Sequence, residues 1–221
     1  KNRKKYINRI SKIEKLIVNS QATKYLIKDL YDLRKNLKVL KSPIFIYEES
    51  FNSKNLKSIK IQKINNNKLK IGFIGRLTLH KNPLFLIKLA ELLKEKSNEL
   101  IQLHFVGSGP ERQNLQNICE QKNIDAIFWG RVRDRREVLS DWKYCIVPSI
   151  REPLGLIPGE MAFQNILTLS SRVDGLQELY PIECNYLLID MIKDKNSNNY
   201  NIQYLPKTNT FGKNFYPNIE Q

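Results

Sequence analysis

The stretch that decides the fold reads KIGFI at residues 70–74, NPLFLIKLAELLKEK at 82–96 and IQLHFV at 101–106. The first and third segments are short and apolar, as buried strands are, and the middle segment repeats its apolar residues at the spacing of an amphipathic helix. A strand, a helix and a second strand in this order predict a β-α-β unit with parallel strands.

The same alternation continues toward the C-terminus. Predicted strands lie at 126–129, 144–148 and 166–169, and predicted helices at 110–122, 135–142, 157–163 and 174–179. Apolar strands that alternate with helices predict an α/β fold, with a Rossmann-like, doubly wound parallel sheet that helices cover on both faces.

The sequence before residue 70 is organised differently. Residues 16–19 (LIVN) predict a short strand, Ser20 is a suitable N-cap for the helix that follows, and residues 37–47 predict an extended stretch. Residues 48–69 are rich in Asn, Lys and Ser and predict a linker. Residues 193–221 predict a similar polar segment, in which we expect no ordered structure around the Asn-rich run that starts at Asn196.

The positive charge is concentrated at the start of the chain. The 221 residues carry 37 Lys and Arg against 22 Asp and Glu, a net charge of +15, of which residues 1–70 contribute +14. Two interpretations of this basic segment stay open: peripheral contact with an anionic membrane through a helical stripe of Tyr6, Ile10, Ile13 and Ile17, or an ordinary solvated helix face. Zinc-finger spacing and RNA-recognition motifs are absent, so we expect no nucleic-acid partner.

Several classes of protein are excluded by composition. No run approaches the roughly 18 apolar residues of a membrane-spanning helix. The three cysteines lie far apart without a CxxC pair, which predicts neither a disulfide framework nor a metal site and favours a cytoplasmic location. The chain starts at Lys1 without a signal peptide, so we expect an internal piece of a longer protein.

Ligands of parallel sheets bind beyond the carboxyl ends of the strands, so the residues that follow each strand are the candidates for a site. Gly75, Arg76 and Lys81 follow the first strand; glycine lets the backbone approach an anion, and two cations suit a diphosphate. The turn at 107–110 (GSGP) opens a helix, but Arg112 stands where a dinucleotide fingerprint needs its third glycine. Residues 107–110 could bind an anion or could simply form a tight turn, and the sequence leaves both interpretations open.

The most informative stretch is PSIREPLGLIPGEMA at residues 148–162. Glu152 lies in the loop after a strand, and Glu160 lies in the first turn of a helix whose start Pro158 fixes near residue 157. The free amides of that helix start favour an anion, and carboxylates accept hydrogen bonds from sugar hydroxyls. Basic groups and carboxylates together predict a ligand that links a sugar to phosphate.

Five segments in this order resemble the signatures of glycosyltransferase family 4, the retaining, nucleotide-sugar-dependent enzymes of the GT-B fold. They are GRLTLHKNP at 75–83, VGSGP at 106–110, FWGRV at 128–132, the E-x7-E motif from Glu152 to Glu160, and DGLQEL at 174–179. Residues 16–36 are similar to the last strand and helix of the family's N-terminal domain.

The resemblance implies a division of the chain into domains. Residues 1–47 would be the remnant of the N-terminal acceptor domain, 48–69 the linker, 70–192 the nucleotide-sugar donor-binding domain, which is the C-terminal half of the GT-B fold, and 193–221 the polar C-terminal segment. Because most of the acceptor domain would be missing, we expect this piece to bind donor but to transfer little sugar.

The resemblance also assigns roles to single residues. Arg76 and Lys81 would hold the donor diphosphate and stabilise the leaving group, Glu152 would position the donor sugar, and Glu160 would bind the ribose. Arg76, Lys81 and Glu152 are the candidate catalytic residues. The candidate donor-binding residues are Gly75, Arg76, Lys81, Gly107, Gly130, Arg131, Val132, Glu152, Leu154, Gly155, Leu156 and Glu160. No metal or other cofactor is implied.

The chain departs from the family pattern at three places. Asn165 and Leu167 replace a glycine and a proline; asparagine also adopts a left-handed conformation, so we expect the turn to survive. Asp174 replaces the first glycine of a Gly-Gly pair and adds a carboxylate near the predicted site.

The function that the resemblance implies is a retaining hexosyltransferase in surface polysaccharide synthesis. It would transfer a sugar from a nucleoside-diphosphate sugar to a glycan or lipid-linked acceptor, in the cytoplasm, with peripheral contact at the inner membrane face. A noncatalytic module of the same fold that binds a nucleotide sugar or a partner stays open, as does a GT-B-like epimerase or phosphorylase.

Overall fold

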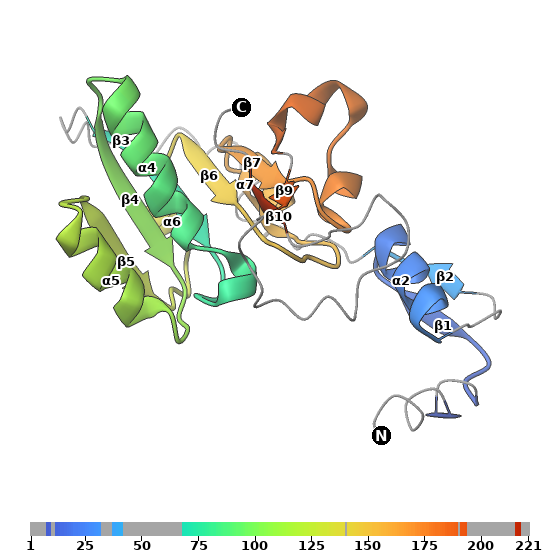
Figure 1. The fold of residues 1–221 in the computed structure, drawn as a ribbon. Coiled ribbons are helices and arrows are strands. Elements are labelled where there is room, and N and C mark those ends of the chain that lie inside the picture. The colour runs from blue at the N-terminus through green and yellow to red at the C-terminus, as the bar shows by residue number, and fades with distance from the viewer. Residues whose placement is uncertain are drawn as a thin grey trace. The chain divides into compact units, whose positions relative to one another are not determined.

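The computed structural model describes residues 8–9, 12–31, 37–41, 68–139, 141–189, 191–193 and 215–217 of the chain (Figure 1). The chain forms two compact units. The first comprises residues 1–43, 150–155 and 171–218, and the second comprises 44–149, 156–170 and 219–221.

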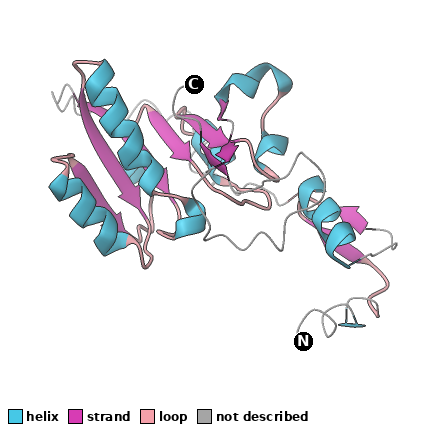
Figure 2. Ribbon diagram, in the orientation of Figure 1, coloured by secondary structure: helices cyan, strands magenta, loops and turns pink. Residues whose placement is uncertain are grey.

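The second unit contains most of the strand-helix alternation. In chain order its elements are β3 (Lys68–Ile74), the 3-10 helix η2 (Leu79–Lys81), α4 (Leu84–Lys96), β4 (Leu100–Val106), α5 (Arg112–Gln121), β5 (Ala126–Gly130), α6 (Arg136–Leu139), β6 (Tyr144–Val147), α7 (Ile157–Ala162) and β7 (Leu167–Ser171). The predicted order of strands and helices is confirmed (Figure 2).

The predicted parallel sheet is also confirmed. Six strands follow the order β5-β4-β3-β6-β7-β8, where β8 is Leu188–Ile189. β3 pairs in parallel with β4 on one side and with β6 on the other, so the chain changes direction across the sheet at β3. In a doubly wound sheet this is the point at which ligands bind.

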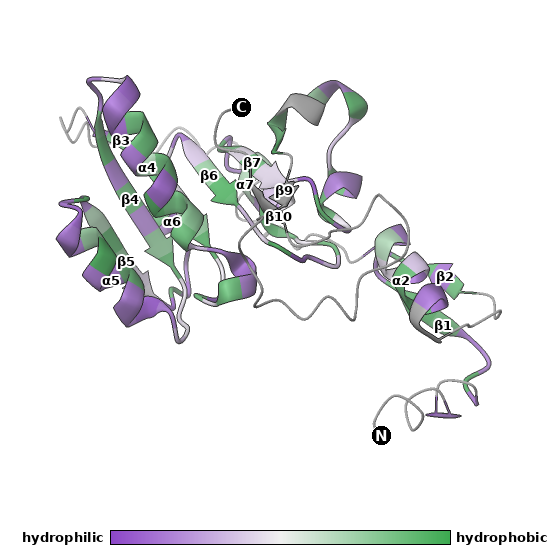
Figure 3. Cartoon of the chain, in the orientation of Figure 1, coloured by the Kyte–Doolittle hydropathy of each residue, from purple (hydrophilic) through white to green (hydrophobic). Residues whose placement is uncertain are grey.

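The core of this unit lies between the sheet and its helices. Phe85, Leu86 and Ile87 of α4 are buried while Lys88 is exposed, so α4 has one apolar and one polar side (Figure 3). On β3, Gly72 leaves room for an indole: a Cβ at this position would lie 1.8 Å from Cζ3 of the buried Trp142.

The first unit contains the N-terminal strand-helix segment. Its elements are β1 (Leu16–Val18), α2 (Gln21–Tyr31), β2 (Leu37–Val39), the 3-10 helices η3 (Leu176–Leu179) and η4 (Ile182–Leu187), β8, β9 (Met191–Lys193) and β10 (Phe215–Pro217). β1 and β2 pair in parallel. The predicted N-cap is confirmed, because the Thr23 amide donates to Ser20 Oγ at 3.0 Å.

Some element boundaries differ from the prediction for local reasons. The predicted helix at 174–179 is replaced by the shorter η3. Asp174 has a φ of 40°, so Asp174 and Gly175 form a turn before η3 begins. The helix predicted from residue 110 begins at Arg112, because the Glu111 amide bonds to the carbonyl of Leu77 instead (3.0 Å). The antiparallel pair of β9 and β10 is not predicted.

The turn at Asn165 is present as expected. Asn165 has a φ of 57°, its amide bonds to the Ala162 carbonyl, and the Ile166 amide bonds to the Met161 carbonyl. This is the Schellman arrangement that commonly ends a helix at a glycine.

Other expectations lie outside the described residues. These are the linker up to residue 67, the Asn-rich run around residue 196 and most of the basic N-terminal helix. None of the helices in the described ranges has the length and apolar character needed to cross a bilayer.

Candidate functional site

Backbone hydrogen bonds join the three loops that follow β3, β4 and β5. The Gly75 amide donates to the carbonyl of Val106 (2.9 Å), and the Leu77 amide donates to that of Ser108 (3.0 Å). The Gly107 amide donates to the carbonyl of Gly130 (2.7 Å). The predicted site residues Gly75, Gly107 and Gly130 therefore lie in one layer at the carboxyl edge of the sheet.

Close packing accounts for the glycines of the 107–110 turn. Gly107 has a φ of 136°, and a Cβ there would lie 1.9 Å from the carbonyl oxygen of Gly75. At Gly109 a Cβ would lie 2.2 Å from the carbonyl oxygen of Leu77. The tight-turn interpretation of this segment thus has a geometric reason, and the donor-binding role of Gly107 stays a prediction.

The layer carries cationic side chains at its rim. Arg76 is exposed and forms no ion pair with another residue of the described ranges. Arg131 donates from Nε to Ser108 Oγ at 3.1 Å. Because Ser108 also accepts the Leu77 amide, it connects the loop of Arg76 to the loop of Arg131.

A short turn sets the position of Lys81. Lys81 is the last residue of η2, and its amide donates to the Thr78 carbonyl (3.0 Å). Asn82 then ends the turn in a left-handed conformation with a φ of 54°. The segment between β3 and α4 therefore places Lys81 on a defined turn five residues after Arg76.

Sequence reasoning did not identify the support that Arg112 gives to β5. Its Nη2 donates to the carbonyl of Phe128 at 3.0 Å, and its guanidinium lies 5.8 Å from the centre of the Phe128 ring. The residue that breaks the dinucleotide fingerprint therefore holds the end of β5, whose last residue is Gly130 and which the half-buried Val132 follows.

Glu160 lies in the first turn of α7, as the sequence predicts. Its amide donates to the carbonyl of Leu156 (3.0 Å), and its Oε2 forms an ion pair with Nη1 of Arg135. The sequence did not single out Arg135, which lies directly before α6 in the run RVRDRRE at 131–137. The ion pair fixes the orientation of the carboxylate that we expect to bind a sugar hydroxyl.

In the first unit, Asp174 organises the segment that carries Glu152. Asp174 Oδ2 accepts from Arg151 Nε at 2.7 Å and from the Glu152 amide at 2.9 Å. The Gly175 amide donates back to the Glu152 carbonyl (3.0 Å). The carboxylate that replaces a family glycine is therefore buried and engaged with this segment, in which Leu154 is also buried.

Position 155 has no room for a side chain, so it requires glycine. Its φ is 77°, and a Cβ there would lie 2.6 Å from Cδ2 of Leu176 and 2.8 Å from Cγ of Glu152. The predicted site residues thus divide between the units: Glu152, Leu154 and Gly155 belong to the first unit, and the others to the second.

The buried cysteines of the second unit are not nucleophiles. Burial, with the added negative charge of Glu160, raises the pKa of Cys145 to about 12, and burial raises that of Cys119 to about 11. Both thiols stay protonated at neutral pH, and the thiolate is the reactive form. Within the described ranges, no three His, Cys, Asp or Glu side chains are grouped to hold a metal ion.

Alkylation of the native protein at pH 8 is expected to modify Cys184 well before Cys119 and Cys145. Cys184 is partly exposed, while the other two thiols are buried. Mass spectrometry after brief treatment with iodoacetamide should show one modified cysteine, and three after unfolding in urea. Equally fast modification of Cys145 in the native protein would contradict the buried position.

The strand order defines a Rossmann-like, doubly wound fold with cationic side chains at the carboxyl edge of its sheet. The family model described as "Glycosyl transferases group 1" matches residues 54–190, which is more than half of the chain. The chain belongs to this family.

Curated relatives share this region. The chain is 29% identical over 119 residues to the uncharacterized glycosyltransferase MJ1607 of Methanocaldococcus jannaschii, a match that covers 52% of this chain and 30% of that protein. It is 30% identical over 136 residues to an uncharacterized 42.6 kDa protein in the cps region of Klebsiella pneumoniae, covering 59% and 34%. It is 32% identical over 92 residues to the putative glycosyltransferase EpsF of Bacillus subtilis, covering 41% and 24%. The chain thus matches about a third or less of the length of these relatives.

Solved structures share the fold. Superposition on a TarM variant of S. aureus, in complex with fondaparinux, alpha-GlcNAc-glycerol and UDP, gives a TM-score of 0.58 at 23% identity and covers 77% of this chain and 32% of that chain. Superposition on HepE of Anabaena, in complex with UDP and glucose, gives a TM-score of 0.57 at 16% identity and covers 76% and 47%.

Proposed function

We propose that the chain is the donor-binding half of a retaining glycosyltransferase of family 4. It binds a nucleoside-diphosphate sugar and serves the transfer of a hexose to a glycan or lipid-linked acceptor in surface polysaccharide synthesis, at the cytoplasmic face of a membrane. The cps-region relative and the UDP complexes of TarM and HepE support this proposal. The relatives are about three times longer than the matched region, so we propose that the 221 residues alone bind donor and transfer little sugar.

The observation that carries the proposal is the cationic rim of the glycine layer. Arg76 and Arg131 project from two loops that Ser108 holds together, and Arg76 has no carboxylate partner among the described residues. A planar guanidinium can donate two parallel hydrogen bonds to a diphosphate. At Gly75 the backbone of the layer can approach an anion without a side chain in the way.

The chemistry that follows is electrostatic. Negative charge develops on the leaving nucleoside diphosphate, and fixed cations stabilise that charge without rearranging in the transition state. In this proposal Arg76 and Lys81 supply the cations, so transfer proceeds without a bound metal ion. Glu160, oriented by Arg135, accepts hydrogen bonds from the ribose, and Glu152 accepts them from the donor sugar.

Titration calorimetry of the 221-residue chain with UDP, GDP and ADP, each with and without Mg²⁺, tests this function. We expect one nucleotide to bind in the micromolar to millimolar range without Mg²⁺. We expect Arg76→Ala and Glu160→Ala each to weaken that binding by about tenfold, because each removes a charged hydrogen-bonding group.

Lys96→Ala is the matched control for the loss of a positive charge. Lys96 is exposed and ends α4, near the amino end of β4, away from the carboxyl edge. We expect this variant to bind as the wild type does. Equal affinity in all four proteins, or the absence of binding to any nucleotide, would contradict the proposal and favour a partner-binding module.

A further inference from the structure

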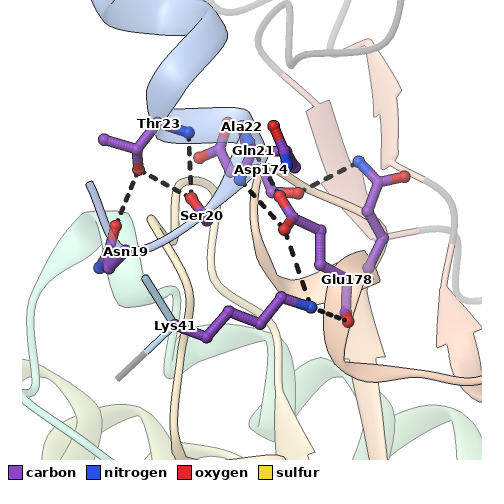
Figure 4. Close-up of polar contacts among 9 residues, drawn as sticks. Asn19, Ser20, Gln21, Ala22, Thr23, Lys41, Asp174 and Glu178 are labelled. Carbon is purple, nitrogen blue, oxygen red and sulfur yellow. Dashed lines mark hydrogen bonds and ion pairs between the residues drawn. The ribbon is translucent and has the colours of Figure 1, made fainter. Parts of the chain in front are cut away.

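A carboxylate from far along the chain caps helix α2. Oε1 of Glu178 accepts from the Ala22 amide at 2.8 Å, and Oε2 accepts from the Gln21 amide at 3.1 Å (Figure 4). Ser20 Oγ accepts the Thr23 amide (3.0 Å). The first three free amides of α2 are therefore satisfied, two of them by a residue more than 150 positions away.

Lys41 holds Glu178 from the other side. Its Nζ donates to the Glu178 carbonyl at 3.1 Å and lies 4.0 Å from Glu178 Oε2 (Figure 4). The side chain of Glu178 is 17% exposed, so water screens these contacts only in part. The start of α2 thus contacts the carboxylate of Glu178, and Lys41, which follows β2, contacts both its carboxylate and its backbone carbonyl.

The short helix that carries Glu178 is packed against the segment of Glu152. Asp174 and Gly175 make reciprocal hydrogen bonds with Glu152, as described above, and a Cβ on Gly175 would lie 2.0 Å from the Pro153 carbonyl oxygen. The Glu178 amide in turn donates to the Gly175 carbonyl (3.1 Å). A displacement of η3 therefore displaces residues 151–155.

We propose that Glu178 is a positioning residue that couples helix α2 to the segment carrying Glu152. Its carboxylate ties η3 to the start of α2, and Asp174 and Gly175 pass that constraint to the backbone of Glu152. The coupling between α2 and Glu152 rests on these contacts alone. That it helps to position a donor sugar rests on the proposed function.

Glu178→Gln tests the coupling with the least change in size. A glutamine has one oxygen that can accept one of the two amides, while its NH2 group faces the other amide donor. The charge that favours the positive helix terminus is also lost. The variant therefore weakens the cap without opening a cavity.

Hydrogen exchange resolved by mass spectrometry on the 221-residue chain gives the readout. In Glu178→Gln we expect the amides of Gln21 and Ala22 to exchange about fivefold faster, and those of Glu152 and Gly175 to accelerate to a similar degree. Glu178→Asp keeps the carboxylate, and we expect it to restore part of the protection at both places.

Two controls separate coupling from general loosening. Ser20→Ala removes the local cap of α2 and should accelerate exchange at Thr23 while leaving Glu152 protected. Glu183→Gln removes an exposed carboxylate of η4 and should leave both segments unchanged.

Wild-type protection of Glu152 and Gly175 in a Glu178→Gln chain whose α2 start exchanges faster would overturn the proposal. Acceleration of Glu152 in Ser20→Ala to the same degree would overturn it as well, because Glu178 would then have no special part. A failure of nucleotide binding in the calorimetric experiment contradicts the proposed function and leaves the exchange result standing.

Discussion

Replacement of Gly107 by alanine is expected to lower the free energy of unfolding by at least about 3 kcal/mol. The new Cβ would lie 1.9 Å from the Gly75 carbonyl oxygen, which is backbone and has no rotamer to change. The φ of 136° is also one that residues with a Cβ rarely adopt. Relief requires the loops after β3 and β4 to separate, which breaks the hydrogen bonds from the Gly75 amide to Val106 and from the Leu77 amide to Ser108.

Urea unfolding followed by circular dichroism measures this loss, with Ser108→Ala as the matched control. The side chain of Ser108 accepts one hydrogen bond from an exposed arginine, so its removal should change the free energy of unfolding by less than about 1 kcal/mol. If Gly107→Ala is as stable as Ser108→Ala, the close approach of the two loops is wrong.

The second large effect concerns acid and a buried histidine. His104 on β4 is 3% exposed and lies between both tryptophans of the chain. The indole N–H of Trp129 can only donate, so Nδ1 of His104 accepts from it (3.1 Å), and Nε2 carries the proton that it donates to Gln102 Oε1 (3.0 Å). A second proton on this ring would face the Trp129 donor.

Burial and the positive charge of Lys70 lower the pKa of His104 from 6.5 to about 4, although Asp125 and Asp141 oppose the shift. Between pH 6.5 and about pH 4, His104 is protonated in the unfolded chain but stays neutral in the folded chain. The contribution of the neutral ring is complete above pH 6.5 and is lost as the pH falls toward 4. We expect acidification from pH 7 to 4 to lower the free energy of unfolding by about 3 kcal/mol through this residue.

Urea unfolding at several pH values, followed by tryptophan fluorescence, measures this effect, because Trp129 and Trp142 both contact the histidine ring. His104→Gln stays neutral at every pH and is the reference. Its own stability should be lower at pH 7, but the decrease between pH 7 and 4 should be smaller than in the wild type by about 3 kcal/mol. Parallel curves for the two proteins would show that the histidine is free to protonate in the folded state.

The sheet could be predicted because its information is local. Parallel strands covered on both faces are continuous apolar runs, and the segments at 70–74, 101–106 and 144–148 have this character without reference to any partner. β9 and β10 lack it: they are short and lie in or beside a polar segment, and the antiparallel pairing that stabilises them joins residues far apart in the sequence.

The charged partners of the site could not be predicted in the same way. Glu160 is recognisable from its spacing to Glu152 and from Pro158, but Arg135 stands 25 residues earlier in a run of several arginines. Only the fold selects which arginine meets the carboxylate. The sequence places the Asp174 carboxylate near the site, but only the fold shows that its partners are Arg151 and the Glu152 amide.

The start of helix α2 has one contact that the local sequence predicts and one that it does not. Ser20 caps the helix from the adjacent position and was predicted, because side-chain caps of this kind follow from the local sequence. Glu178 caps the same turn from the far end of the chain, and no local pattern indicates it. Prediction from sequence thus extends to contacts between neighbours and ends where the fold chooses the partner.

The contact between Gly72 and Trp142 has a consequence for how this family can diversify. The indole occupies the volume that any larger residue at position 72 would need, since even a single methyl group there would lie 1.8 Å from an indole carbon. Substitutions at positions 72 and 142 are therefore expected to depend on each other. A side chain can arise at position 72 only in a lineage that has already exchanged the indole for a smaller group.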